Sequence, residues 1–184
     1  MTFNRYPALF LFLFILFLVH PAFVCAAEKP GHDPDSLGYI VRVGDPCPYF
    51  ELSLADGSKT TLAQLKGKLV LLQFTASWCS VCRREMPVIE EEIWQVYKEK
   101  GLILIGVDRD EPLEKVKLFS SEMKISYPLA LDPGAEVFAL FAGKQSGVTR
   151  NVLISPDGKI IFLTRLFERT EFDRMIEVIG KVLK

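Results

Sequence analysis

The sequence predicts a single α/β domain, a mixed β-sheet with helices on both faces, and three observations support this prediction. A chain of 184 residues with 49% hydrophobic side chains is long enough for one domain with a buried core. Two continuous apolar runs, 69–74 and 102–107, are typical of buried central strands, and the one helix expected between them makes them parallel. The turn at 155–158 joins two further strands, which therefore run antiparallel.

The segment before the first central strand predicts two small elements. Residues 50–61 alternate around the turn Asp56-Gly57 and indicate a β-hairpin. Residues 61–65 predict a short helix that Gly67 ends.

Three longer helices follow from apolar residues at helical spacing. The first is expected from about residue 79 to residue 100, the second at 112–123 with a proline at its start, and the third at about 170–183. The long first helix separates the two central strands, so the sequence predicts a βαβ unit followed by a β-hairpin.

The first residues are typical of an export signal. The apolar run Ala8–Val19 follows Arg5 and is short for a membrane span but suits the core of a signal peptide. Small residues after it offer a cleavage site behind Ala26. We therefore expect a signal peptide at 1–26.

A segment rich in Pro, Gly, Asp and Lys comes next, so a flexible tether is expected at 27–39 and the folded domain at 40–184. Two alternatives to cleavage stay open. The signal could remain as an anchor, or Cys25 could carry a lipid, although Val24 stands where that motif has a small residue.

Charge and cysteine content exclude two classes of protein. The 22 basic and 23 acidic residues leave a net charge of -1, so no positive field favours nucleic acid, and no nucleic-acid partner is expected. Of the four cysteines, Cys25 is lost with the signal, which leaves an odd number. The mature chain is therefore not a disulfide-stapled scaffold.

Cys79 and Cys82 lie directly after a predicted buried strand, in the first turn of the long helix. Free N–H groups and the helix dipole stabilise an anion there, so the Cys79 thiolate is favoured and its pKa should fall. Cys82, one turn further in, should be less exposed. The pair suits disulfide exchange, with Cys79 attacking and Cys82 resolving. A structural disulfide and half of a zinc site remain as alternatives.

Several motifs in order resemble the exported thioredoxin-like thiol-disulfide oxidoreductases of the TlpA and ResA type, which are related to the peroxiredoxins. The matching segments are Val43–Pro46 with Phe50, Leu65–Val70, Phe74–Cys79, Cys82–Pro87 and Asp157-Gly158. The resemblance covers about residues 40–184. It implies a thioredoxin fold, a periplasmic or envelope location, and disulfide reduction without a bound cofactor or metal.

Two neighbours of the pair match positions of that family. Glu85 matches an acidic residue thought to help proton transfer; otherwise it is a first-turn carboxylate placed for the helix dipole. Trp78 matches the tryptophan before the first cysteine and is expected to shield the site and contact substrate, unless it simply packs in the core.

The sequence departs from the family at two positions. Gln73 stands where cytoplasmic thioredoxins carry a buried aspartate, and an amide cannot titrate. Thr149 stands at the family's cis-proline position, so the Val148–Thr149 bond is expected to be trans. Thr149 and Arg150 stay candidates for the substrate-binding loop.

Cys47 is interpreted as a small buried residue, with a redox role as the alternative.

The leading hypothesis is a disulfide reductase that acts on envelope proteins as substrates and is kept reduced by a membrane thiol electron donor. A monomer is expected, with membrane contact only if the chain is lipidated or keeps its signal. Two alternatives remain open: a peroxidase of peroxiredoxin type, and a non-enzymatic thioredoxin-fold binding module.

Overall fold

The computed structural model describes residues 1–2 and 37–184, so the expected signal peptide and most of the expected tether lie outside the described residues. The packed structure begins just before residue 40, because Tyr39 is buried and the Leu37 carbonyl accepts a hydrogen bond from Arg150. In the described part of the chain, no helix combines the length and the apolar character that crossing a bilayer requires.

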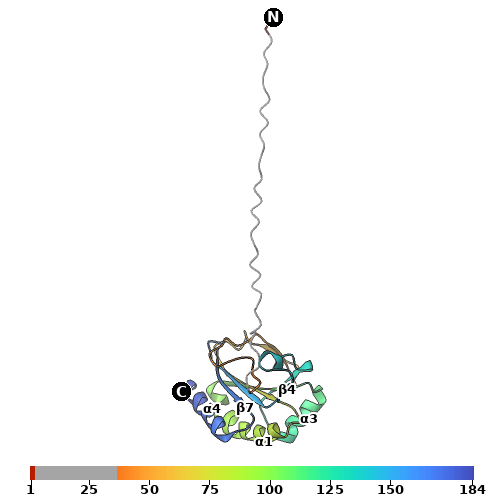
Figure 1. The fold of residues 1–184 in the computed structure, drawn as a ribbon, viewed down its shortest axis with the longest axis vertical. Helices are drawn as coiled ribbons and strands as arrows, with labels where there is room; N and C mark the ends of the chain where they lie inside the picture. The colour runs from red at the N-terminus through yellow and green to blue at the C-terminus, as the bar shows by residue number, and fades with distance from the viewer. Residues whose placement is uncertain (3–36) are drawn as a thin grey trace.

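Within these residues seven strands form one mixed sheet in the order β2-β1-β5-β4-β3-β6-β7. Figure 1 shows α1, α3 and α4 together along one side of the molecule. The strands are β1 Glu51–Leu54, β2 Lys59–Thr61, β3 Leu69–Thr75, β4 Leu102–Arg109, β5 Leu129–Asp132, β6 Arg150–Ile154 and β7 Ile160–Arg165. Strands β3, β4 and β5 run parallel, whereas β6 is antiparallel to β3 and to β7. The predicted βαβ unit, the mixed sheet and both hairpins are confirmed.

The helical segments are α1 Ser80–Ile89, the π-helical η1 Glu90–Trp94, α2 Gln95–Tyr97, the 3-10 helix η2 Lys98–Lys100, α3 Leu113–Met123, the 3-10 helices η3 Pro133–Ala135 and η4 Phe138–Leu140, and α4 Arg169–Val182. The expected long first helix is thus one helical rod whose hydrogen bonding changes along its length. Pro87 lies inside α1 and lacks a backbone donor, and the wider π turn follows it within one turn.

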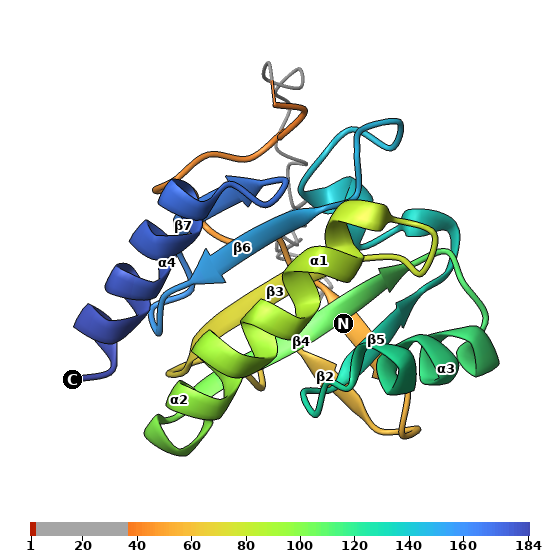
Figure 2. The same cartoon turned by 90° about the horizontal axis from the view of Figure 1, so that it is seen from below.

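The two faces of the sheet are covered unequally. Leu69 and Leu71 of β3 point to the face covered by α1, α3 and α4, where they pack with residues such as Met86 and Phe172. Figure 2 shows α1 lying across the sheet, with α3 near β5 and α4 beside β7. The opposite face is covered by the chain around Tyr39 and by the short helices η3 and η4. Helices lie on both faces, as predicted, but the long ones share one face.

One local prediction is wrong, and one strand was not predicted. Residues 62–67 form consecutive turns instead of a short helix, because the backbone N–H groups of residues 64–66 donate to carbonyls three residues earlier, as Gln64 does to Thr61 and Lys66 to Ala63. The Gln64 side chain accepts a hydrogen bond from the Thr61 N–H, and Gly67, at φ 84°, ends the segment as expected. Strand β5 was not predicted, because its four residues follow no clear period.

The connections on either side of β3 bring two distant segments together. Helix α1 starts just after the carboxyl end of β3, and β6 begins at that same end, since Arg150 pairs with Phe74. The loop 76–79 therefore lies beside the residues that lead into β6. This end of the sheet carries the site.

Candidate active site

Cys79 is the N-cap residue of α1. Its backbone is extended, with φ -88° and ψ 108°, and its Sγ accepts the Cys82 N–H at 3.2 Å. A cap normally offers an oxygen to such a free N–H group, and here a sulfur takes that place. The helix end therefore stabilises negative charge on Cys79.

The two sulfurs occupy different environments. Cys79 is 9% exposed, whereas Cys82 is 0% exposed. The pKa of Cys79 lies well below the ordinary range because the Cys82 thiol donates to it; burial opposes the shift, and Thr149 and backbone N–H groups add to it. The pKa of Cys82 is raised, first by its hydrogen bond to Cys79 and then by burial. This asymmetry matches the roles expected for an attacking and a resolving cysteine.

Thr149 lies against both sulfurs. Its Oγ1 is 3.1 Å from Cys79 Sγ and 3.2 Å from Cys82 Sγ, and its side chain is almost fully buried. The Val148–Thr149 peptide bond is trans, in line with the sequence. The residue at the expected substrate loop therefore faces the cysteine pair itself.

Arg150 points away from the cysteines. Its side chain is fully buried, donates to the carbonyls of Gly147 and Leu37 at 3.0 and 2.7 Å, and stacks on Tyr39. The guanidinium thus ties the loop to the start of the folded chain, and the Arg150 backbone is paired with Phe74 and Arg165 inside the sheet.

Glu85 is fully buried, one helical turn after Cys82. Its Oε1 accepts a hydrogen bond from Asn151 Nδ2 at 2.7 Å, and its Oε2 accepts one from Gln73 Nε2 at 3.3 Å. Burial raises the pKa of Glu85 to about 7, although these two donors oppose the rise. A carboxylate placed for the helix dipole would lie at the surface, so the interpretation based on the dipole alone does not describe Glu85.

The amides around Glu85 belong to a network that sequence reasoning missed. Gln73 Oε1 accepts the Tyr127 hydroxyl at 2.7 Å, and Asn151 Nδ2 also donates to Thr164 Oγ1 at 2.9 Å. All of these side chains are buried. One sequence feature could have indicated this network: Asn151 is an amide directly before the apolar residues Val152–Ile154. A polar side chain buried in a strand needs hydrogen-bond partners.

The loop before Cys79 is held by a second polar cluster. Glu111 accepts the backbone N–H of Ser77 at 2.5 Å and the Ser77 hydroxyl at 2.7 Å, and it pairs with Lys115 at 2.7 Å. Burial opposes ionisation, but these donors keep the pKa of Glu111 below its ordinary value. Asp108 is buried beside it, and burial and the Glu111 charge raise the pKa of Asp108 to about 8.

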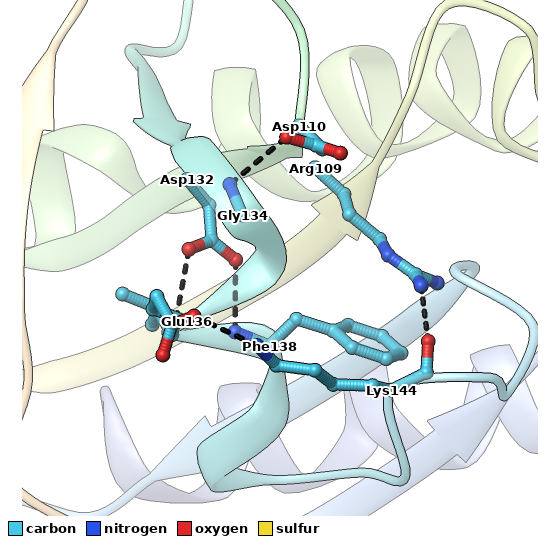
Figure 3. Close-up of polar contacts among 8 residues, drawn as sticks. Arg109, Asp110, Asp132, Gly134, Glu136, Phe138 and Lys144 are labelled. Atoms are coloured by element: carbon cyan, nitrogen blue, oxygen red, sulfur yellow. Dashed lines mark hydrogen bonds and ion pairs between the residues drawn. The ribbon is translucent and has the colours of Figure 1, made fainter.

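Trp78 is 62% exposed, so it is not a core residue, and it lines a pocket beside the cysteine loop with Arg109, Asp110 and residues 145–147. Figure 3 shows polar contacts of Arg109 and Asp110, two of the residues that line this pocket. Arg109 donates to the carbonyls of Lys144 and Ser146, and Asp110 accepts the Gly134 N–H at 2.9 Å. These contacts hold Arg109 and Asp110 in place beside the pocket.

Cys47 is buried and not bonded to Cys79 or Cys82, and its Sγ contacts the Pro48 carbonyl at 3.5 Å. Burial raises the pKa of its thiol to about 12, so it carries no thiolate near neutral pH. It belongs to the same core cluster as Cys79 and Cys82, as a small apolar side chain.

The fold and the cysteine pair at a helix N-terminus define a thioredoxin-like protein. A family model described as AhpC/TSA matches residues 43–163, and the chain belongs to this family. The thiol-disulfide oxidoreductase ResA of a Bacillus cereus strain is 34% identical over 121 residues, 66% of this chain and 68% of the relative. The ResA of Oceanobacillus iheyensis is 35% identical over 125 residues, 66% of this chain and 64% of the relative.

Solved structures agree with this assignment. The chain superimposes on a candidate protein disulfide isomerase from Bacteroides thetaiotaomicron with a TM-score of 0.78 and 53% identity, over 81% of this chain and 94% of that one. A candidate thiol:disulfide interchange protein DsbE from Chlorobium tepidum gives a TM-score of 0.69 at 26% identity, over 78% and 99%. The protein is a thiol-disulfide oxidoreductase, a class that acts on disulfide-bonded proteins.

Proposed function

We propose that this protein reduces disulfide bonds of envelope proteins after its export, with Cys79 as the nucleophile and Cys82 as the resolving cysteine. The observation that carries the proposal is the asymmetry of the pair. Cys79 is the helix cap and the more exposed sulfur, whereas Cys82 is fully buried. An incoming disulfide therefore meets Cys79 first.

The exchange proceeds in two displacements. The Cys79 thiolate attacks one substrate sulfur, a mixed disulfide forms as the substrate S–S bond breaks, and the other substrate sulfur leaves as a thiolate. Cys82 then gives its proton to Glu85 and attacks Cys79 Sγ, which releases the second substrate sulfur. The substrate gains two electrons, and the enzyme is left with a Cys79–Cys82 disulfide.

Glu85 suits the proton-accepting role in the second step. Two amide donors satisfy its ionised form, yet burial keeps its pKa near neutrality at about 7. A base of that strength matches the operating pH of an envelope enzyme. Gln73 cannot titrate, and its hydrogen bond to Glu85 positions the Glu85 carboxylate.

Trp78 and Thr149 are proposed to form the substrate-binding surface around Cys79, and the buried Arg150 is proposed to hold this loop in place. The support is their arrangement: Thr149 contacts the cysteines, and exposed Trp78 borders the neighbouring pocket. A membrane thiol donor is proposed to return the disulfide to the dithiol. The reducing direction is also supported by the Ser80-Val81 dipeptide, which lacks a histidine that would stabilise the thiolate further.

The first test is the reduction potential of the pair in the purified domain, equilibrated in glutathione or dithiothreitol buffers and read by thiol alkylation. A value near or below about -250 mV supports a reductase, and a value near about -120 mV reverses the proposed direction. The absence of a reversible couple would favour the binding module. Turnover with hydrogen peroxide in place of a disulfide would favour the peroxidase.

The second test separates the two cysteines. Cys82→Ser should accumulate a mixed disulfide with an oxidised protein substrate, because resolution is blocked, whereas Cys79→Ser should form none. Cys47→Ala is the matched control, since Cys47 is also buried but lies outside the pair, and it should turn over like the unmodified chain. A mixed disulfide that forms on Cys82 would reverse the assigned roles.

A further inference from the structure

The Thr149 hydroxyl group lies where the cysteine pair meets the loop before β6. Its Oγ1 is within 3.2 Å of both sulfurs, and its side chain is 2% exposed. A hydroxyl at this position can enter the chemistry, whereas a proline ring offers neither a donor nor an acceptor.

The hydrogen-bonding capacity of the three groups determines the direction of these contacts. A hydroxyl has one proton and accepts through its lone pairs, so it donates to one sulfur only. Cys79 is the sulfur that carries the negative charge, at the helix cap, and Cys82 is the buried thiol. The Cys82 proton can face Cys79 or Thr149 Oγ1, and both arrangements leave the hydroxyl proton for the charged sulfur.

The backbone fixes the hydroxyl in this place. The Thr149 carbonyl accepts the Leu166 N–H at 3.1 Å, and the next residue, Arg150, pairs with Phe74 in the sheet. The buried Arg150 side chain holds the same loop through the Gly147 and Leu37 carbonyls. Thr149 therefore reaches the sulfurs without an ordering step at the moment of reaction.

We propose that Thr149 is a catalytic residue, whose hydroxyl donates a hydrogen bond to the Cys79 thiolate and holds the reduced pair ready to attack a disulfide. This role goes beyond substrate binding and rests on the proposed attack by Cys79. The bond is strongest while Cys79 is charged and weakens when the sulfur enters a disulfide. Thr149 therefore favours the dithiol over the disulfide form.

The test compares Thr149→Val with Thr149→Ser. Valine keeps the shape of threonine and removes the hydroxyl, whereas serine keeps the hydroxyl and removes a methyl group. The readouts are the pH profile of Cys79 alkylation by iodoacetamide and the equilibrium of the pair with glutathione. In Thr149→Val the Cys79 pKa should rise by about one unit, which lowers the thiolate fraction about tenfold at pH values below both pKa values.

The same variant should shift the glutathione equilibrium about tenfold toward the disulfide, because the reduced form loses the matching stabilisation. Thr149→Ser should stay close to the unmodified chain in both readouts. Glu85 is the ionisable group that faces the pair from α1, so the profiles are repeated in Glu85→Gln to separate its titration from that of Cys79. Circular dichroism checks folding, and Thr149→Ala replaces valine if valine prevents folding.

An unchanged Cys79 profile in Thr149→Val overturns the proposal, and so does a Thr149→Ser variant that loses as much as valine, since packing would then be the cause. Failure of the proposed function looks different. If the protein reduces no protein disulfide but Thr149→Val still raises the pKa of Cys79, the reductase function and the catalytic role of Thr149 are both overturned. The hydrogen bond from Thr149 to the Cys79 thiolate is then still supported.

Discussion

Glu85 and Asp108 are both fully buried carboxylic acids near the cysteine loop, yet their surroundings differ. Glu85 accepts hydrogen bonds from two amides, so its ionised form is solvated by the protein. Among the described residues no hydrogen-bond donor reaches either oxygen of Asp108, and the nearby Glu111 charge adds to burial in raising the pKa of Asp108. Both effects disfavour the ionised form of Asp108. Glu85 is therefore built to ionise, and Asp108 to stay neutral.

This difference agrees with the proton-transfer role proposed for Glu85 and with a structural role for Asp108. A carboxyl group that moves a proton must be stable enough in both forms, and the amides around Glu85 provide for the charged one. Asp108 lies beside Thr75 in the sheet and is near Glu111, the residue that anchors Ser77. We infer that Asp108 supports the position of the loop, not the reaction.

The largest expected effect is that of Glu85→Gln on the resolving step. The release of the second substrate thiol should slow by about 10²-fold, the usual range for loss of a general base. In the unmodified chain this step should quicken as pH rises through about 7, because Glu85 must ionise to accept the proton. Single-turnover kinetics across pH measure both effects.

The matched control is Asp108→Asn, which also changes a buried carboxyl group to an amide. It should leave the rate of the resolving step and its pH profile unchanged. The comparison would be wrong if the rate of the resolving step in Glu85→Gln still increased near neutral pH. It would also be wrong if that increase were absent in Asp108→Asn.

The next effect is on stability. The pKa of Asp108 is raised from 3.8 to about 8, so the folded state binds a proton that the unfolded state releases. Its contribution to stability is complete below pH 3.8 and is lost as pH rises toward 8. Asp108→Asn should flatten this fall and gain about 1–3 kcal/mol at pH 8, because no buried charge has to form. Urea unfolding at several pH values measures it, and a slope that is the same in Asp108→Asn contradicts a raised pKa of Asp108 in the folded state.

The smallest effect is expected from Tyr127→Phe. This change removes the hydroxyl that donates to Gln73 Oε1 and leaves the ring in the core. Stability should fall by about 1 kcal/mol, since a buried acceptor loses its donor. The kinetic pKa of the resolving step should move slightly, as Gln73 gains freedom beside Glu85. If the variant matches Glu85→Gln in rate, Tyr127 takes part in proton transfer.

Much of the fold could be predicted from local patterns. The apolar runs of β3 and β4, the helix between them and the β6–β7 hairpin each show in a few neighbouring residues. The short strand β5 and the turns at 62–67 do not, because segments of four to six residues take their form from what they pair with. The π turn η1, which follows Pro87, was not predicted from the sequence either.

The site divides in the same way. Residues 79–82 determined by themselves a cysteine pair at a helix N-terminus, because the cap, the spacing and the dipole are local. Only the tertiary structure decided which groups surround the sulfurs. It brings Thr149 to both of them across 67 and 70 residues, buries Arg150, and gives Glu85 two amide partners from β3 and β6. Such distances depend on how the strands pair, and burial depends on what covers each side chain, so neither is encoded in any short stretch of the chain.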